Sequence, residues 1–277
     1  MKAPFRPLPS VSGLVASVNT CLYPFAFLAL ILVGKVSAQT VYDMSDPVQF
    51  ANNFMITSQA AGSTLGVSGG KLQDVTTTAG TATWVYDTTP DSTATNASFQ
   101  NFTTSMLVNF GASNSGIGFY FFDGGNRSNS LLALVNVNNG SSNDIIRFFS
   151  GASLTAGSAG TQQGTTTTLT NGAFELNNNY LLTLTANYIG AGQVDATLTL
   201  SDPNSLISAF SASYSFTGVA AMAGEIGFRS STALSPATNA FDDFSIPAVP
   251  EPTVMAFLGL GIILITVTIK RRGLSSI

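Results

Sequence analysis

Hydrophobic and polar residues alternate with a period of two along several stretches of the chain. In residues 210–216, three aromatic residues and an alanine occupy one parity and three serines occupy the other. Residues 194–200 alternate in the same way. In residues 131–137 one parity is apolar throughout, and an Asn-Asn-Gly turn signal follows. This alternation is typical of strands that bury one face, so each stretch is predicted to form a β-strand.

The spacing of such stretches also predicts hairpins. Residues 180–188 and 194–200 flank the glycine-containing loop 189–193, and residues 102–110 and 117–122 flank a second glycine-containing loop. Further predicted strands cover residues 49–56, 71–75, 81–86, 144–149, 225–229 and 241–246.

About twelve strands without an amphipathic helix between them predict an all-β protein. The simplest way to bury their apolar faces is a single antiparallel β-sandwich of the jelly-roll type. No repeat of fixed period supports a propeller or a β-helix. Residues 150–168 are rich in Gly, Thr and Ser, which is consistent with either a long loop or a weak edge strand.

Charge and cysteine content exclude several functions. Between residues 39 and 251 there are four basic and fourteen acidic residues, a net charge of −10 when Glu251 is counted. Such a surface repels phosphate backbones, which argues against nucleic-acid binding. The chain has no His, and its one cysteine, Cys21, lies near the N-terminus. Disulfides, cysteine catalysis and His-ligated zinc are therefore not expected.

Residues 1–38 are predicted to be a secretory signal peptide. Lys2 and Arg6 precede an apolar run at residues 22–33, and small residues before the end of the segment offer a cleavage site after Ala38. A retained signal anchor is the alternative. Twelve apolar residues are too few to cross a hydrocarbon core of ~30 Å, so cleavage is favoured.

The C-terminal segment, residues 248–277, combines a Pro-Glu-Pro motif, an apolar stretch and a basic cluster. The apolar stretch, at about residues 253–269, is long enough for a short transmembrane helix. Basic residues after it are expected to stay in the cytoplasm. The motif is Pro250, Glu251 and Pro252, and the basic cluster is Lys270, Arg271 and Arg272.

These three elements, in this order, resemble the C-terminal sorting tail of PEP-CTERM proteins. The resemblance implies that an exosortase, a membrane protease-transpeptidase, processes the chain at or near the motif. It also implies an exported protein of the cell envelope or surface, held by its helix before processing, in a bacterium that makes exopolysaccharide and biofilm. An ordinary C-terminal anchor with a chance Pro-Glu-Pro sequence is the alternative.

Residues 39–247 form the predicted ectodomain. Residues 224–229 and 241–246, separated by a polar loop, resemble the closing strands of concanavalin A-like and laminin-G β-sandwiches. Residues 42–54 would then be the matching first strand. Glycoside hydrolases on this fold carry Glu-x-Asp-x-x-Glu on one strand, because their carboxylates must flank a single bond. The three glutamates here are far apart in the chain, so a non-catalytic protein is expected: Glu175, Glu225 and Glu251.

Two sets of residues are candidate binding sites. Asp242 shares strand parity with Phe244, so its carboxylate is predicted to enter the sandwich and to require a partner such as Ca²⁺, with Asp43 as a further ligand. A solvated strand end is the alternative. Trp84, Tyr86 and Tyr120 form a possible sugar-stacking face, and burial in the core is the alternative for them.

These patterns together predict a surface-sorted, non-catalytic protein that binds glycan or has a structural role in the exopolysaccharide matrix. Its expected partners are exosortase, the membrane and exopolysaccharide. An unusual glycan-active enzyme on a lectin- or glucanase-like sandwich and a passive envelope spacer remain the alternatives.

Overall fold

The computed structural model describes residues 39–59, 61–77, 81–87, 101–121, 129–138, 142–153, 156–170, 172–219, 226–232 and 236–247. The predicted signal peptide, the Pro-Glu-Pro motif and the basic cluster lie outside these residues. Within the described ranges, no helix has the length and apolar character needed to cross a membrane.

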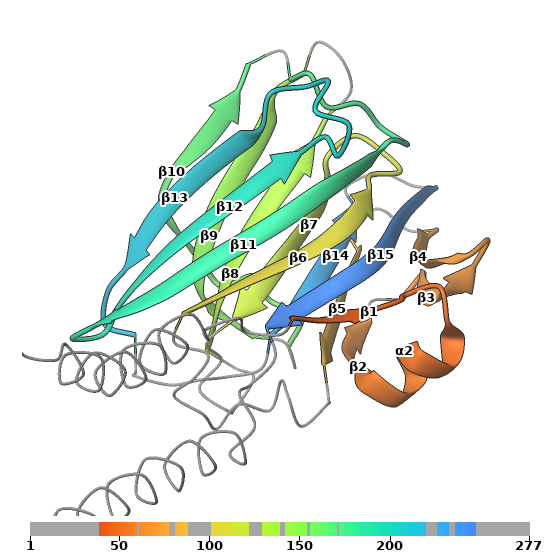
Figure 1. The fold of residues 1–277 in the computed structure, drawn as a ribbon, viewed down its shortest axis with the longest axis horizontal. Helices are drawn as coiled ribbons and strands as arrows, with labels where there is room; N and C mark the ends of the chain where they lie inside the picture. The colour runs from red at the N-terminus through yellow and green to blue at the C-terminus, as the bar shows by residue number, and fades with distance from the viewer. Residues whose placement is uncertain are drawn as a thin grey trace, which may run out of the picture. The chain divides into compact units, whose positions relative to one another are not determined.

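The described residues form two antiparallel sheets (Figure 1). The front sheet has the order β13 (Phe210–Phe216), β12 (Gln193–Ser201), β11 (Asn179–Gly190), β6 (Asn101–Asn109), β15 (Ala237–Pro247), β4 (Lys71–Thr76) and β3 (Ser63–Ser68), and β1 (Gln39–Tyr42) pairs with β15. The back sheet has the order β10 (Thr161–Leu169), β9 (Asp144–Ala152), β8 (Ser130–Val137), β7 (Ser115–Phe121), β14 (Gly227–Thr232), β5 (Thr81–Asp87) and β2 (Phe54–Gln59). The predicted all-β, two-sheet class is confirmed.

The core lies between the sheets and follows from the alternation in the sequence. Along β12 and β6, buried apolar residues alternate with half-buried or exposed residues, mostly polar ones, as the period of two predicts. The buried apolar residues of these strands are Val194, Ala196, Leu198, Leu200, Phe102, Met106 and Val108, and Thr104 of β6 is buried as well. The predicted strand at residues 210–216 coincides with β13.

Phe244 joins the two sheets at one end of this core. It belongs to β15 of the front sheet and is fully buried. Its ring centroid lies 5.6 Å from that of Phe54, 6.0 Å from that of Phe119 and 5.8 Å from that of Phe228. All three partners belong to back-sheet strands, so Phe244 packs the first, middle and last parts of the domain together.

The predicted strand at residues 49–56 is wrong in its first half. A short helix, α2 (Pro47–Asn53), comes first, and β2 begins at Phe54. Asp46 caps the helix, because its carboxylate accepts hydrogen bonds from the backbone N–H groups of Val48 and Gln49. The predicted first strand at residues 42–54 is wrong for the same reason.

The predicted hairpin of residues 102–110 and 117–122 is also wrong. β6 belongs to the front sheet and β7 to the back sheet, so the link between them crosses the sandwich instead of closing a hairpin. The chain makes this crossing closely against β15, since a Cβ on Gly111 would lie 2.1 Å from the carbonyl oxygen of Thr238. In contrast, β11 and β12 form the predicted hairpin. For residues 150–168 the sequence allowed either a long loop or a weak edge strand. The structure shows the edge strand β10 from Thr161 onward.

Candidate functional site on the outer face of the back sheet

The predicted ligand-face residues come together on the back sheet. Trp84 and Tyr86 lie in β5 and Tyr120 lies in β7, with β14 between the two strands. In the strand register, Gly227 of β14 pairs with Tyr120 on one side and with Tyr86 on the other. The three positions therefore lie in neighbouring rows of one sheet. The structure describes the backbone of β5 but not its side chains.

An arginine row crosses five strands of the same sheet. Arg147 pairs with Leu134, Leu134 with Gly118, Gly118 with Arg229, and Arg229 with Trp84. Residues directly paired in a sheet project from the same face. The apolar residues that flank Arg147 and Arg229 in sequence face the core, so the arginine row lies on the outer face.

Arg147 contacts polar and aromatic groups on this face. Its Nη2 donates a hydrogen bond to Oδ1 of Asn136 at 2.7 Å, and its guanidinium carbon lies 5.6 Å from the ring centroid of Phe149. Asn136 in turn donates from Nδ2 to the carbonyl oxygen of Asn114 at 3.2 Å. The Arg147 side chain is thus oriented by β8 and β9 together.

Arg229 is oriented from its own strand. Its Nη1 donates a hydrogen bond to Oγ of Ser231 at 2.7 Å, and that hydroxyl donates to the carbonyl oxygen of Gly116 at 3.2 Å. A Cβ on Gly116 would lie 2.7 Å from Nδ2 of Asn136 and 2.9 Å from Oγ of Ser231. An amide and a hydroxyl from different strands therefore converge over Gly116, and only a glycine leaves them room.

Burial disfavours the ionised state of both arginines, and like charge adds to this for Arg229. Burial lowers the pKa of Arg147 below its ordinary value. Burial, and then the positive charge of Arg147, lower the pKa of Arg229 to about 10. The backbones of the two residues are three strands apart, ~14 Å at ordinary strand spacing. The hydrogen-bond partners of the two guanidinium groups, Asn136 and Ser231, nevertheless converge over Gly116, which lies on a strand between those of the two arginines.

One part of the outer face of the back sheet is buried, and another part is accessible to solvent. Tyr120, Leu132, Leu134 and Phe149 are buried and form a second apolar cluster, separate from the core between the sheets. In contrast, Arg147, Arg229 and Ser231 are only half-buried. The aromatic stacking role of Trp84, Tyr86 and Tyr120 stays a prediction, and the structure places the Tyr120 ring out of contact with solvent.

The sequence suggested Arg229 only as a possible partner of Asp242, which lies on the other sheet, and did not indicate that Arg147 and Arg229 share a face. A signal for Arg147 existed, because it is the one charged residue within the apolar run 145–149. The placement of both arginines in one row could not be predicted from the sequence, because it depends on the registers of three strand pairs.

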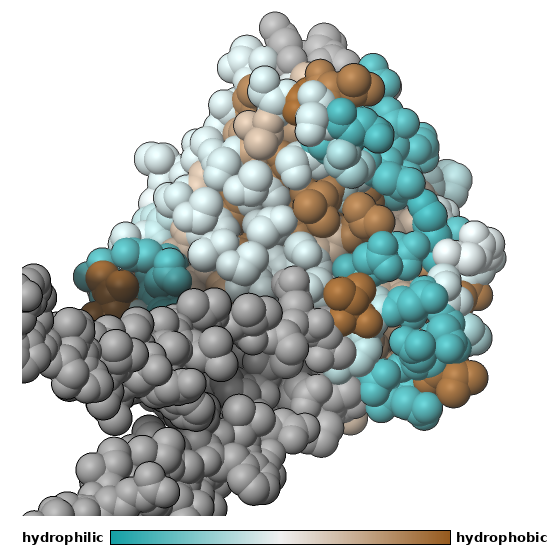
Figure 2. Space-filling view, in the orientation of Figure 1, coloured by the Kyte–Doolittle hydropathy of each residue, from teal (hydrophilic) through white to brown (hydrophobic). Residues whose placement is uncertain are grey.

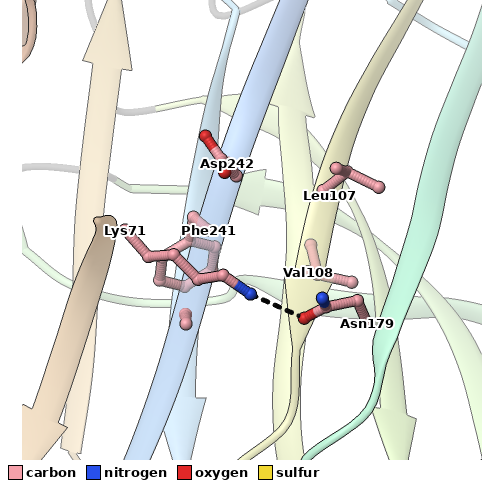
Figure 3. A pocket seen from close by; sticks show the side chains of 7 residues that line it. Lys71, Leu107, Val108, Asn179, Phe241 and Asp242 are labelled. Atoms are coloured by element: carbon pink, nitrogen blue, oxygen red, sulfur yellow. Dashed lines mark hydrogen bonds between the residues drawn. The ribbon is translucent and has the colours of Figure 1, made fainter. Parts of the chain in front are cut away.

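The prediction that the Asp242 carboxylate enters the sandwich is wrong. Asp243 has a φ of +47°, and the register of β15 against β6 shifts between Asp242 and Ser245. This bulge breaks the alternation, so Phe241 and Phe244 both face the core. Asp242 projects instead from the outer face of the front sheet, into a small pocket with Lys71 and Asn179 (Figure 3).

Asp43 is near Asp242, as expected from the pairing of β1 with β15. Asp43 is exposed, and hydrogen bonds from the Ser45 side chain and then its backbone lower its pKa. Burial raises the pKa of Asp242, the negative charges of Asp243 and Asp43 add to this, and Lys71 opposes them. Among the described residues, no three Asp, Glu, His or Cys side chains are grouped to hold a metal ion. Calcium binding stays a prediction.

The outer face of the front sheet is different in character. Its hydroxyl groups bond to one another across strands: Thr103 to Thr185 at 3.1 Å, Thr197 to Ser213 at 2.8 Å, and Thr199 to Ser211 at 2.9 Å. Figure 2 views this face, which is pale over β11 to β13 and therefore of intermediate hydropathy. The charged groups suited to ligand binding lie on the back sheet instead.

Comparison with solved structures identifies the fold. Lectin I-B4 of Griffonia simplicifolia, in a metal-free form, aligns over 77% of this chain and 100% of its own, with a TM-score of 0.52 and 11% identity. The described sandwich has a lectin-like fold. A carbohydrate-binding module, CBM66, of Bacillus subtilis aligns over 69% of this chain and 93% of its own, with a TM-score of 0.43 and 13% identity. A protein of unknown function from Shewanella oneidensis aligns over 88% and 97%, with a TM-score of 0.44 and 15% identity.

No protein-family model and no curated protein matches the sequence. The lectin-like fold supports the concanavalin A-like resemblance of residues 224–229 and 241–246. At 11% identity the likeness shows the fold alone.

Proposed function

We propose that this chain is an exported, non-catalytic protein whose sandwich binds a glycan through the outer face of the back sheet. One observation carries the proposal: polar groups from three strands converge on this face. They are the amide of Asn136, the guanidinium groups of Arg147 and Arg229, and the hydroxyl of Ser231. A few placed polar groups beside apolar surface are typical of sugar and small-molecule sites.

The fold supports a glycan as the class of ligand, because the similar Griffonia protein is a lectin. A non-catalytic role agrees with the composition. The chain has no His and one Cys, and its three glutamates are separated by at least 26 positions, Glu225 and Glu251 being the nearest pair. Serine-histidine and cysteine-histidine chemistry are therefore excluded, and a retaining or inverting carboxylate pair would need aspartates instead.

The two ends supply the proposed location. The signal peptide directs export, and the Pro-Glu-Pro motif with its apolar stretch and basic cluster directs exosortase processing at the membrane. The protein then belongs to the cell surface, where an exopolysaccharide matrix offers glycans to bind. Both terminal segments lie outside the described residues, so this part of the proposal rests on the sequence.

A glycan array tests the binding proposal. The purified full chain should bind a subset of glycans, and Asn136→Ala should weaken that binding because Asn136 holds Arg147 in place. Thr197→Ala is the matched control, since it removes a polar side chain from the outer face of the front sheet. Absence of binding to every glycan would refute the proposal and favour the passive spacer.

Incubation with polysaccharides distinguishes the remaining alternative. Release of shorter oligosaccharides by the purified chain would favour a glycan-active enzyme over a binding protein. Polysaccharide recovered intact is the expected result.

A further inference from the structure

The arginine row concentrates positive charge on a domain that is otherwise acidic. The described residues include three basic side chains: Lys71 on the front sheet, and Arg147 and Arg229 together on the back sheet. The net charge over residues 39–251 is −10. Here two cations share one face.

The contacts of Arg147 leave its charge uncompensated by the described part of the chain. There it contacts the neutral amide of Asn136 and the ring of Phe149, and its Nε has no hydrogen-bond partner. Arg229 is also a half-buried cation, and Arg147 is a second positive charge acting on it. Both effects disfavour its ionised form, so its pKa is lowered. An anion placed between the two guanidinium groups would reverse both effects.

We propose that Arg147 and Arg229 bind the carboxylate of an acidic sugar, so that the ligand of this face is a uronic-acid polysaccharide. This inference rests on the proposed glycan-binding function and gives it a ligand class. A planar carboxylate matches the forked donors of a guanidinium group, which can bind it through two parallel hydrogen bonds. The half-buried hydroxyl of Ser231 is placed to bind a sugar hydroxyl beside the carboxylate, while Asn136, which is buried, keeps Arg147 in position next to it.

The charge of the rest of the domain favours a carboxylated glycan over a densely charged polymer. Long-range repulsion from a surface with net charge −10 grows with the charge carried by the ligand. A uronate carries one charge per sugar and presents neutral hydroxyls around it. Dextran sulfate and double-stranded nucleic acids carry more charge over the same length and are repelled more strongly.

The experiment uses the purified full chain and two forms of one polymer. Polygalacturonate carries a carboxylate on each sugar, and its methyl ester has the same sugars without the charge. We expect the chain to bind polygalacturonate at least about tenfold more tightly than the ester, the factor expected for a charged hydrogen bond. Increasing salt concentration should weaken binding to polygalacturonate and leave binding to the ester unchanged.

Variants assign the effect to the arginine row. Arg147→Gln should weaken polygalacturonate binding by about tenfold or more, while Lys71→Gln removes the same charge from the front sheet and should leave it unchanged. Arg147→Lys keeps the charge but lacks the planar fork, so an intermediate affinity is expected. Thermal melting of each variant shows that it is folded, and Arg147→Lys serves as the test if the Gln variant is not.

The outcomes separate the two proposals. Equal binding to polygalacturonate and its ester would overturn the carboxylate inference but leave the glycan-binding function standing. Tighter binding to dextran sulfate than to polygalacturonate would overturn it in favour of general anion binding. Wild-type affinity in folded Arg147 variants would also overturn it. Binding to neither polymer, with a glycan array that is empty as well, would refute the glycan-binding function itself.

Discussion

Replacing Phe244 with alanine should strongly destabilise the sandwich. Phe244 is fully buried, and its ring lies within 6.0 Å, centroid to centroid, of Phe54, Phe119 and Phe228 on the opposite sheet. Truncation of a buried Phe to Ala generally costs about 3–5 kcal/mol, because apolar contact is lost and a cavity remains. Three aromatic contacts across the sheets place Phe244→Ala in the upper part of that range.

Urea unfolding of the full chain, followed by tryptophan fluorescence, measures this loss. A decrease of about 3–5 kcal/mol in the free energy of unfolding corresponds to a melting temperature lower by about 10 °C in a domain of this size. Ile189→Ala is the control, because Ile189 is 58% exposed at the end of β11 and should change stability by no more than about 0.5 kcal/mol. A loss below about 1 kcal/mol for Phe244→Ala would show that Phe244 does not hold the two sheets together.

Three further predictions concern charge and sorting. Burial raises the pKa of Asp144, so the native state binds this proton more tightly than the unfolded state does. The ionised group therefore lowers the free energy of unfolding as pH rises above about 4. Asp144→Asn should be more stable than wild type at pH 7 in urea titrations, and the difference should vanish at lower pH. The calcium prediction requires that millimolar calcium raise the melting temperature of wild type but not of Asp242→Asn, and identical melting of wild type in calcium and in chelator would reject it. N-terminal sequencing of the exported protein should begin near Gln39, and replacement of Glu251 and its flanking prolines should block processing without preventing membrane insertion.

The alternation of the sequence determined most of the strands and the fold class. β11, β12 and β13 were predicted within two residues at each end, because each buries one face and so repeats with a period of two. β8 was predicted as closely, although it is buried on both faces. The hydroxyl-rich outer face of β11, β12 and β13 follows from the same alternation. Composition was equally informative, since the lack of His and of Cys beyond Cys21 removes whole classes of chemistry.

Local departures from regular structure could not be predicted from alternation. The positive φ of Asp243 turns Phe241 and Phe244 to the same side, and no property of the residues Phe-Asp-Asp-Phe distinguishes this bulge from a regular strand. The cap formed by Asp46 similarly converts a predicted strand into a helix. At Asp243 the backbone conformation accompanies a shift in the pairing of β15 with β6, whereas the helix start is fixed locally by the Asp46 carboxylate.

Only the tertiary structure decided which strands share a sheet and in which register. Arg147 and Arg229 are separated by 82 positions in the chain, and they meet because β9, β8, β7 and β14 pair in that order. A shift of one residue in any of these pairings would move one arginine to the opposite face. The sequence therefore determined that each strand has an outer face, and the packing of the whole domain determined that these two charges occupy the same one.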